Sequence, residues 1–438
     1  MPVAMNFKKV KFSLETGELL LEYSLDGKYN FVEKFIFPNA PFILDSTRKE
    51  ALDKVGHFLH IAAGISYYKA FLPDSVILED FDLTADEARF FEKFYITGLG
   101  EFAVRNNVDF FSKVKFPYKD GIVREQSSIE FSPSALVPIG GGKDSSLAIE
   151  LLKEIDFSAT TIACGEPKPI KQVMERTGCP AIIIKRQIDP ELIRLSNEGK
   201  VLNGHVPITG ILAFMLWAAA ILYDKKYVIM ACERSANQEN TEYLGVKINH
   251  QYSKSYDFEK DFYALTQKFT PEFRYFSLLR PISEIHIAKL FADKCKDYFD
   301  VFTSCNKAFK LDENKRLSHW CGECDKCRFV FLVLAMFMDK QKLIDVLGGN
   351  PLDDENQIKG YEELLGLSGH KPFECVGTYE ECNYAFYKLS QKREWQNDKV
   401  IAVLKDRVKP VDAGDLFIPK GEHLIPKEFD NVLAEFRK

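Results

Sequence analysis

The sequence predicts an α/β protein whose central domain is a twisted parallel sheet with helices on both faces. Short apolar runs that suit buried strands alternate with segments of helical periodicity, and a glycine-rich turn joins one of these runs to a helix. A smaller α+β module is expected before this domain and a small module after it. The predicted boundaries are 1–130, 131–345 and 346–438.

The N-terminal module is predicted from a change of periodicity. Partly alternating segments within 7–44 indicate a small sheet with Asp26-Gly27 as a turn. Residues 47–70 and 84–106 then carry apolar side chains at three- and four-residue spacing, which is typical of helices.

The central domain is predicted from an apolar run at 135–139 that leads into three glycines and an amphipathic stretch. Further strands are expected at 160–164, 181–184 and 227–232, and helices at 145–154, 208–223 and 328–338. Ligands of such sheets bind beyond the carboxyl ends of the strands. Glycine and proline turns after 345 indicate the C-terminal module.

Composition excludes several classes of function. The net charge of −6 and a pI near 5.9 give no general attraction to nucleic acid. The longest apolar stretch, 208–223, is shorter than the roughly 20 residues that cross a bilayer, so no membrane insertion is expected. The N-terminus lacks the pattern of a secretory signal, and the cysteines fit a reducing compartment, so a cytoplasmic protein is expected.

The glycine-rich turn is a candidate nucleotide site. Backbone N–H groups in such a turn, together with the N-terminus of the following helix, converge on phosphate oxygens. A Walker A loop is excluded because Val137 replaces its first glycine and Asp144 follows the lysine. The alternative is a plain glycine turn in which Asp144 or Ser145 caps the helix. The candidate residues are Gly140, Gly141, Gly142, Lys143, Asp144 and Ser145.

Four cysteines form a candidate structural zinc site. They are Cys305, Cys321, Cys324 and Cys327. Four thiolates suit tetrahedral Zn²⁺ and leave no ligand position for water. The alternatives are buried or free thiols, and His319 as a competing ligand.

Four polar stretches, 203–209, 233–240, 249–255 and 369–377, are dense in side-chain donors and acceptors, as a polar ligand requires. Arginine and lysine among them suit phosphates and carboxylates. The candidate substrate-binding residues are Asn203, Arg234, Asn237, Asn249, Gln251, Ser253, Lys254 and Lys371.

The glycine-rich segment resembles the Ser-Gly-Gly-x-Asp-Ser loop of ATP-pyrophosphatases, the PP-loop superfamily with the adenine nucleotide α-hydrolase-like fold, although Gly140 replaces its first serine. The resemblance implies that Gly141, Gly142, Lys143 and Ser145 surround the phosphates of ATP, with Asp144 near Mg²⁺. Such enzymes cleave ATP between its α- and β-phosphates.

The polar stretches and the segment 320–331, together with 59–69 and 98–102, closely resemble the UDP-N-acetyl-α-D-muramoyl-L-alanyl-L-glutamate epimerase (MurL) family. The likeness covers most of the chain and weakens after about Thr378. It implies a role in peptidoglycan precursor synthesis, in which the terminal L-Glu of UDP-MurNAc-L-Ala-L-Glu is converted to D-Glu while ATP gives AMP and pyrophosphate. It also implies a functional link to the ligase that adds the L-Glu.

This chemistry requires an acid/base group at the glutamate α-carbon. A carboxyl joined to AMP loses its charge, so the neighbouring proton becomes acidic enough for a side-chain base. His250 and His205 rank first because they lie in polar stretches expected near the nucleotide. The further candidates are Cys375, His370 and Glu233, with Glu374 as another base or metal ligand.

Two other functions remain open. A PP-loop synthase of the deazaguanine or tRNA-modification type would use the same loop and cysteine cluster. A non-catalytic nucleotide-binding protein would keep the loop without turning ATP over.

Overall fold

The computed structural model describes residues 3–310 and 313–437. The chain divides into two compact units that are each discontinuous in sequence. Unit 1 comprises Met1–Leu136, Ile182–Val228 and Glu242–Tyr275. Unit 2 comprises Val137–Ala181, Ile229–Thr241 and Phe276–Lys438. The fold is mixed α/β, with a large, mostly parallel sheet flanked by helices.

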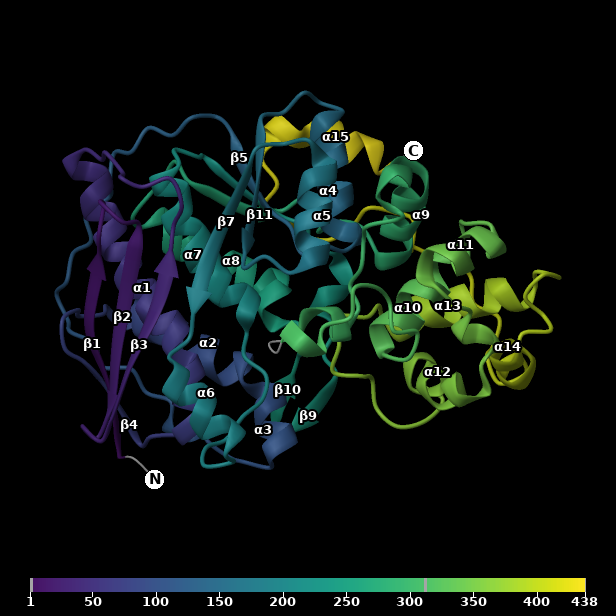
Figure 1. The fold of residues 1–438 in the computed structure, drawn as a ribbon, viewed down its shortest axis with the longest axis horizontal. Coiled ribbons are helices and arrows are strands. Elements are labelled where there is room, and N and C mark those ends of the chain that lie inside the picture. Colours follow the sequence, from purple (N-terminus) through teal and green to yellow (C-terminus); the bar gives the residue numbers. More distant parts are fainter. Residues whose placement is uncertain (1–2, 311–312, 438) are drawn as a thin grey trace. The chain divides into compact units, whose positions relative to one another are not determined.

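The N-terminal strands of unit 1 form an antiparallel meander, as predicted. Its strands are β1 (Ala4–Phe12), β2 (Glu18–Leu25) and β3 (Tyr29–Ile36), which lie side by side in Figure 1. The predicted turn between β2 and β3 is confirmed, since Asp26 and Gly27 have φ values of 51° and 67°. Both φ values are left-handed, and the turn has three residues, 26–28, between the paired Leu25 and Tyr29. A short strand, β4 (Ser75–Leu78), pairs parallel with β1.

The meander does not stand alone. β3 pairs antiparallel with β7 (Ala181–Gln187), a strand expected to belong to the central domain. Buried Glu33 on β3 and Arg186 on β7 form an ion pair at 2.6 Å across this junction. The N-terminal strands therefore extend a larger sheet.

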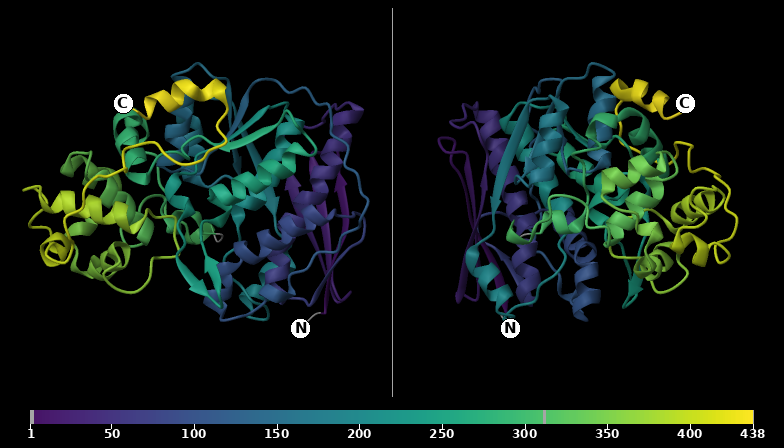
Figure 2. Two further views of the ribbon diagram at one scale, coloured as in Figure 1. Left: turned by 180° about the vertical axis from the view of Figure 1, so that it is seen from behind. Right: turned by 45° about the vertical axis from the view of Figure 1, so that its right-hand side comes forward.

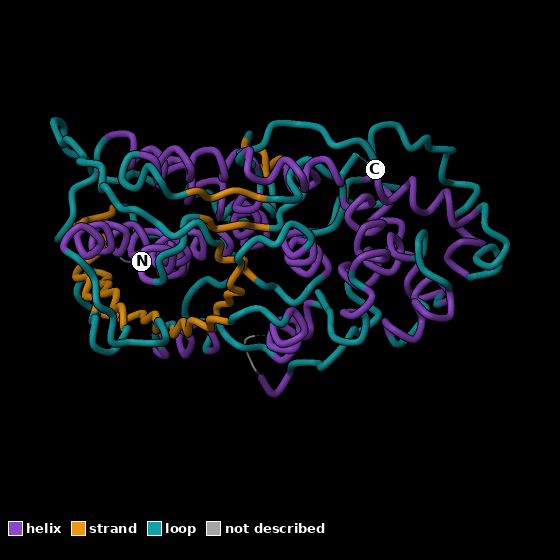
Figure 3. Tube along the Cα trace, turned by 90° about the horizontal axis from the view of Figure 1, so that it is seen from above, coloured by secondary structure: helices purple, strands orange, loops and turns teal. Residues whose placement is uncertain are grey.

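Helices cover these strands. They are α1 (Ser46–Phe71), α2 (Ala85–Gly98), α3 (Gly100–Asn106), α6 (Pro190–Asn197), α7 (Ile208–Leu222) and α8 (Tyr256–Gln267). α1 packs against β1, β2 and α7, and Figure 3 shows helices along the concave side of a curved row of strands. Gly64 permits this contact because a Cβ there would lie 2.3 Å from the ring of Phe7. Within the described residues, no helix has the length and apolar character needed to cross a membrane.

The strand–turn–helix predicted around the glycines is confirmed. The strands concerned are β5 (Ala135–Pro138), β6 (Ala159–Cys164), β8 (Tyr227–Met230) and β11 (Arg274–Ser277), which neighbour one another in the order β11-β8-β5-β6. The pair β5–β8 is parallel. The helices beside them are α4 (Lys143–Lys153), α5 (Lys168–Thr177) and α9 (Glu284–Lys294), and α4 packs on both others.

The last third of the chain is helical and appears green to yellow in Figure 2. Its helices are α10 (Asp325–Leu334), α11 (Lys340–Leu347), α12 (Ile358–Leu365), α13 (Tyr379–Ser390), α14 (Lys399–Leu404) and α15 (Asp430–Glu435). The helix predicted at 328–338 is placed slightly late, because α10 starts after the extended residue Cys324 and Asp339 caps a new helix.

Shorter elements connect these parts. A hairpin comprises β9 (Thr241–Tyr243) and β10 (Val246–Ile248). Short 3-10 helices are η1 (Phe111–Lys113), η2 (Arg234–Asn237), η3 (Tyr252–Lys254), η4 (Lys296–Tyr298), η5 (Asn306–Phe309), η6 (Glu313–Lys315), η7 (Pro351–Asp353), η8 (Glu355–Gln357) and η9 (Lys427–Phe429).

Candidate active site

The glycine-rich turn of unit 2 presents its backbone at the start of α4. Gly142 is the N-cap residue and supplies no side-chain cap, so neither Asp144 nor Ser145 caps the helix. Gly141 has a φ of 82°, and a Cβ there would lie 3.3 Å from the backbone nitrogen of Ile170. Both facts favour glycine at this position. The Gly140 N–H donates to Ser145 Oγ at 3.3 Å, which closes the turn.

Lys143 lies at the base of this turn between two carboxylates. Its Nζ contacts Asp144 Oδ1 and Glu284 Oε2, the latter on the first residue of α9. Lys143 and Glu284 are each 3% exposed. Burial opposes the charge of Lys143, but Asp144 and Glu284 outweigh burial and raise its pKa. Lys143 thus stays protonated, and the two carboxylates that contact its Nζ offset its charge.

Glu381 holds the start of α9 in place. Its Oε1 accepts from the Glu284 N–H at 2.7 Å, and its Oε2 accepts from the Thr378 N–H at 2.6 Å. The hydroxyl of Ser235 donates to the same carboxylate at 2.7 Å. Buried Glu381 therefore joins η2, α9 and α13, and through Glu284 it reaches Lys143.

The predicted residues of 233–240 lie beside this network. Glu233 is buried, and its carbonyl accepts from Arg280 Nη1 at 2.7 Å. Arg234 donates to the carbonyls of Ile418 at 3.0 Å and Asp415 at 3.2 Å, so its guanidinium anchors the C-terminal chain. Exposed Asn237 ends η2.

The predicted residues of 369–377 differ in their surroundings. Lys371 is buried and donates to Gln238 Oε1 at 2.9 Å, and burial lowers its pKa. His370 is exposed, with its ring edge-on to Phe373 at 5.5 Å. Cys375 is partly buried. This stretch therefore offers one buried cation and one exposed imidazole.

The four predicted cysteines converge in unit 2. The Sγ of Cys324 lies 3.4 Å from that of Cys327 and 4.0 Å from that of Cys305, and the Sγ atoms of Cys321 and Cys327 are 3.7 Å apart. Tetrahedral zinc with Zn–S bonds of about 2.3 Å would separate its sulfurs by about 3.8 Å. The set therefore fits a Cys₄ zinc site. His319 is not among the residues grouped with it.

The segment that carries Cys305 packs against the glycine-rich turn. The Thr303 N–H donates to the Gly141 carbonyl at 2.8 Å. Cβ atoms placed at Gly141 and Gly142 would lie 3.4 Å from Phe309 and Ser304 respectively. The segment that includes Cys305 therefore forms one wall of the turn.

Unit 1 brings the two highest-ranked histidines together. The Nδ1 atoms of His205 and His250 both face Glu101 Oε2, at 3.3 Å for His205 and in direct hydrogen-bond contact for His250. The ring centroids are 4.6 Å apart. Burial, and then the charge of His250, lowers the pKa of His205 to about 4.

Further polar side chains border this histidine pair. Lys69 Nζ donates to Asn203 Oδ1 at 2.8 Å and to the Gly204 carbonyl at 2.9 Å. Burial lowers the pKa of Lys69 to about 8. The chain at 203–205 is thereby tied to α1.

The predicted residues after β10 form a turn at η3. Asn249 Oδ1 accepts from the Gln251 N–H at 2.8 Å, so Asn249 shapes the backbone next to His250. Gln251 and Ser253 are buried and Lys254 is partly buried.

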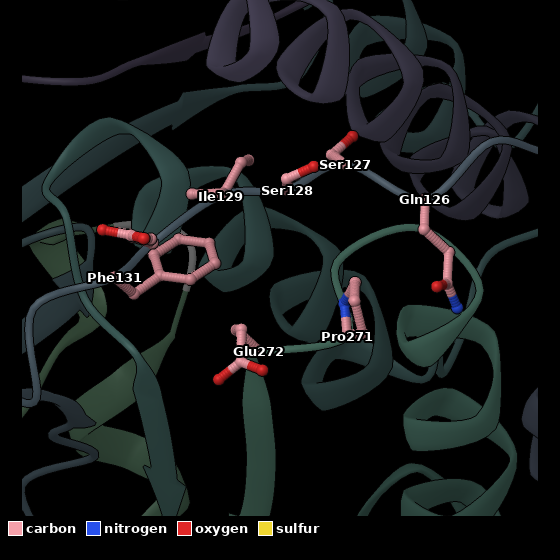
Figure 4. A pocket seen from close by; sticks show the side chains of 8 residues that line it. Gln126, Ser127, Ser128, Ile129, Phe131, Pro271 and Glu272 are labelled. Carbon is pink, nitrogen blue, oxygen red and sulfur yellow. The ribbon is translucent and has the colours of Figure 1, made fainter.

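A surface pocket of unit 1 lies among other residues. Its volume is about 550 Å³, and Figure 4 shows Gln126, Phe131 and Glu272 among the side chains around it. None of the predicted site residues lines this pocket. Its lining contains no histidine, cysteine or lysine, so it does not supply the expected chemistry.

Three acidic residues were missed as site residues by sequence reasoning: Glu101, Glu284 and Glu381. Glu101 lies within 98–102, which carried part of the family resemblance without an assigned role. Glu381 had a readable signal, because Thr378 and Glu381 form a capping box at the start of α13. Glu284 had none, since a glutamate in the first turn of a helix is ordinarily a surface residue.

Comparisons with known proteins cover nearly the whole chain. The MurL N-terminal domain matches residues 2–278, and the MurL C-terminal domain matches residues 301–415. A UDP-N-acetyl-alpha-D-muramoyl-L-alanyl-L-glutamate epimerase of Xanthomonas oryzae pv. oryzae is 36% identical over 98% of this chain and 97% of its own length. Proteins of the same name from a Micromonospora species and from Salinispora tropica are 38% and 36% identical, over 99% and 98% of this chain and 98% and 95% of their own lengths. The chain belongs to the MurL family.

Proposed function

We propose that the chain is an epimerase of peptidoglycan precursor synthesis that inverts the terminal L-Glu of UDP-MurNAc-L-Ala-L-Glu. The observation that carries this proposal is the similarity to three curated epimerases over 98–99% of the chain. The substrate is a small molecule, and the ligase that adds L-Glu would supply it.

We further propose that the nucleotide turn of unit 2 activates the glutamate carboxyl with ATP, as in PP-loop enzymes. The glycine backbone and the uncapped N-terminus of α4 support a phosphate site. Asp144 is half-buried beside Lys143 and would hold Mg²⁺, which neutralises charge on the departing pyrophosphate.

Activation explains why an epimerase would need a nucleotide. Removing the α-proton beside a free carboxylate would place two negative charges together. Joining the carboxyl to AMP removes one of them, so a side-chain base of moderate strength suffices. Hydrolysis then releases the inverted product with AMP.

For proton transfer, His205 and His250 remain the preferred residues because they share one carboxylate partner in unit 1. Glu233 and Cys375 follow, since both are at least partly buried. His370 ranks last because it is exposed and packs on Phe373.

The experiment that tests the function is chiral analysis of glutamate released from the UDP-linked L-Ala-L-Glu substrate, with and without ATP. Conversion to D-Glu that requires ATP and yields one AMP per turnover is expected. Inversion without ATP would contradict the activation step. Absence of ATP turnover would favour a non-catalytic nucleotide-binding protein.

Asp144→Asn tests the turn directly. We expect AMP formation to fall by about 10²-fold or more, because a carboxylate that positions the metal is lost. Asp156→Asn is the matched control, as Asp156 is an exposed aspartate beyond the other end of α4. Equal rates for the two variants would refute the role of Asp144.

The cysteine cluster is proposed to bind one structural Zn²⁺. Metal analysis of the purified chain should give one zinc per chain, and Cys324→Ser should abolish it. The loss should also speed amide hydrogen exchange at 303–309, which the cluster anchors. Cys179→Ser is the control, because Cys179 lies outside the cluster. Full zinc content in Cys324→Ser would disprove this site.

A further inference from the structure

Glu101, His205 and His250 form a compact group in unit 1. Three such side chains can hold a metal ion, and their ligand atoms lie within 4.8 Å of one another. A tetrahedral metal would keep every pair of ligand atoms about 3.3 Å apart. His250 Nδ1 touches Glu101 Oε2 as a hydrogen-bond partner, which is the geometry of an imidazole held by a carboxylate.

We propose that Glu101 is a positioning residue that holds the Nδ1 atoms of His205 and His250 on one carboxylate oxygen, so that the two rings share a single positive charge. The pair then acts as one acid/base group whose two rings differ in protonation. The use of this pair in α-proton transfer rests on the proposed function. The tautomers of the two rings and their shared charge do not depend on that function.

The charges around the pair allow one imidazolium and disfavour two. Glu101 Oε2 is the hydrogen-bond partner of His250 Nδ1 and lies 3.3 Å from His205 Nδ1, while its Oε1 accepts from Arg105 Nε at 2.5 Å. Glu101 therefore offsets one positive charge, and Arg105 and Lys69 add two more nearby. A second imidazolium would enter a site that is already positive.

Burial decides which ring is neutral. His205 is the ring whose pKa is lowered to about 4, by burial first and then by the charge of His250. His250 makes the closer contact with Glu101. Burial raises the pKa of Glu101, but His250, His205 and Arg105 together outweigh burial and lower it. We therefore place the single charge on His250, the ring in hydrogen-bond contact with the carboxylate, and the proton of neutral His205 on Nδ1, which lies 3.3 Å from the same oxygen.

Ring-¹⁵N NMR of the histidines in the full-length protein tests the arrangement without any substrate. His205→Gln and His250→Gln assign the two rings. At neutral pH we expect one neutral ring with its proton on Nδ1 and one imidazolium. In Glu101→Gln the imidazolium should titrate at least one pH unit lower, because the amide carries no charge. Asp74→Asn, an exposed aspartate of unit 1, should leave both rings unchanged.

Two results would overturn the inference. One is that each ring titrates at the same pH in Glu101→Gln as in the unaltered protein. The other is metal binding by this group, measured as the zinc content of each protein after addition of ZnCl₂. A loss of one zinc per chain in Glu101→Gln, with the cysteine cluster intact, would show that the three residues hold a metal ion.

The role in proton transfer has a separate test. Deuterium incorporation at the glutamate α-carbon, divided by AMP formed, should fall by about 10²-fold in Glu101→Gln, with a shifted pH profile. Failure of the unaltered protein to invert the substrate would refute the proposed function. The NMR experiment would still test whether Glu101 holds the two histidines. Inversion by Glu101→Gln with an unchanged pH profile would refute the pairing's role.

Discussion

His60 shows how a single buried residue of unit 1 links stability to pH. It is 2% exposed, packs against the rings of Phe7 and Tyr23, and donates from Nε2 to the Glu22 carbonyl at 2.8 Å. Burial lowers its pKa from 6.5 to about 3. Between these values the unfolded chain binds a proton that the folded chain does not, so the free energy of unfolding falls as the pH falls.

We therefore predict that His60→Gln makes unfolding less sensitive to acid. Glutamine keeps a donor for the Glu22 carbonyl but does not titrate. The unaltered protein should lose up to about 1.4 kcal/mol more than the variant for each pH unit below about 6.5. Urea unfolding of both proteins at about pH 7 and pH 5 measures the difference, and parallel losses would contradict the prediction.

Gly141 is a second residue whose substitution should have a measurable effect, here on AMP formation. Gly141→Ala combines a positive φ with a close contact to Ile170, so the turn must move and AMP formation should fall by about tenfold or more. Gly178→Ala is the control, because Gly178 has a φ of 69° but open space around its Cβ position. Only Gly141→Ala should raise the KM for ATP; an equal KM in both variants would show that crowding at the turn is unimportant.

At the scale of elements, the start of α9 depends on Glu381. Glu381→Ala leaves the Glu284 N–H and the Ser235 hydroxyl without their buried acceptor, which should cost about 2–4 kcal/mol of unfolding free energy. ATP turnover should fall as well, because Glu284 positions Lys143. Glu380→Ala is the matched control, since Glu380 is the exposed neighbour on α13. Thermal unfolding of the two variants should differ clearly, and similar midpoints would refute the anchoring role.

Elements were predictable where the signal is local. The glycine turn, the strands beside it and the Asp26-Gly27 hairpin follow from short-range patterns, and the structure confirms them. The pairing of β3 with β7 joins segments that are distant in sequence, and neither strand has a local sequence pattern that identifies its partner. This pairing was therefore not predictable. Glu101 and Glu284 were not recognised because burial and charge pairing arise only in the folded chain.

At the scale of the whole molecule, the order of segments along the chain determines which fragments can fold. Unit 1 takes its segments from three parts of the sequence, separated by segments of unit 2. A fragment 1–130 would keep α1 but lose α7, the helix on which α1 packs, and β7, the partner of β3. Its apolar surfaces would then be exposed to water.

We predict that fragment 1–130 does not fold on its own. Circular dichroism should show helix and strand content below that of the same residues in the full chain, and urea should unfold the fragment without a cooperative transition. Fragment 1–275 is the informative comparison, because it contains all of unit 1 together with the intervening segments of unit 2, and it should be the more ordered of the two. A cooperative transition in fragment 1–130 would show instead that the meander and α1 form an independent module, since the buried contacts to α7 and β7 would then be dispensable.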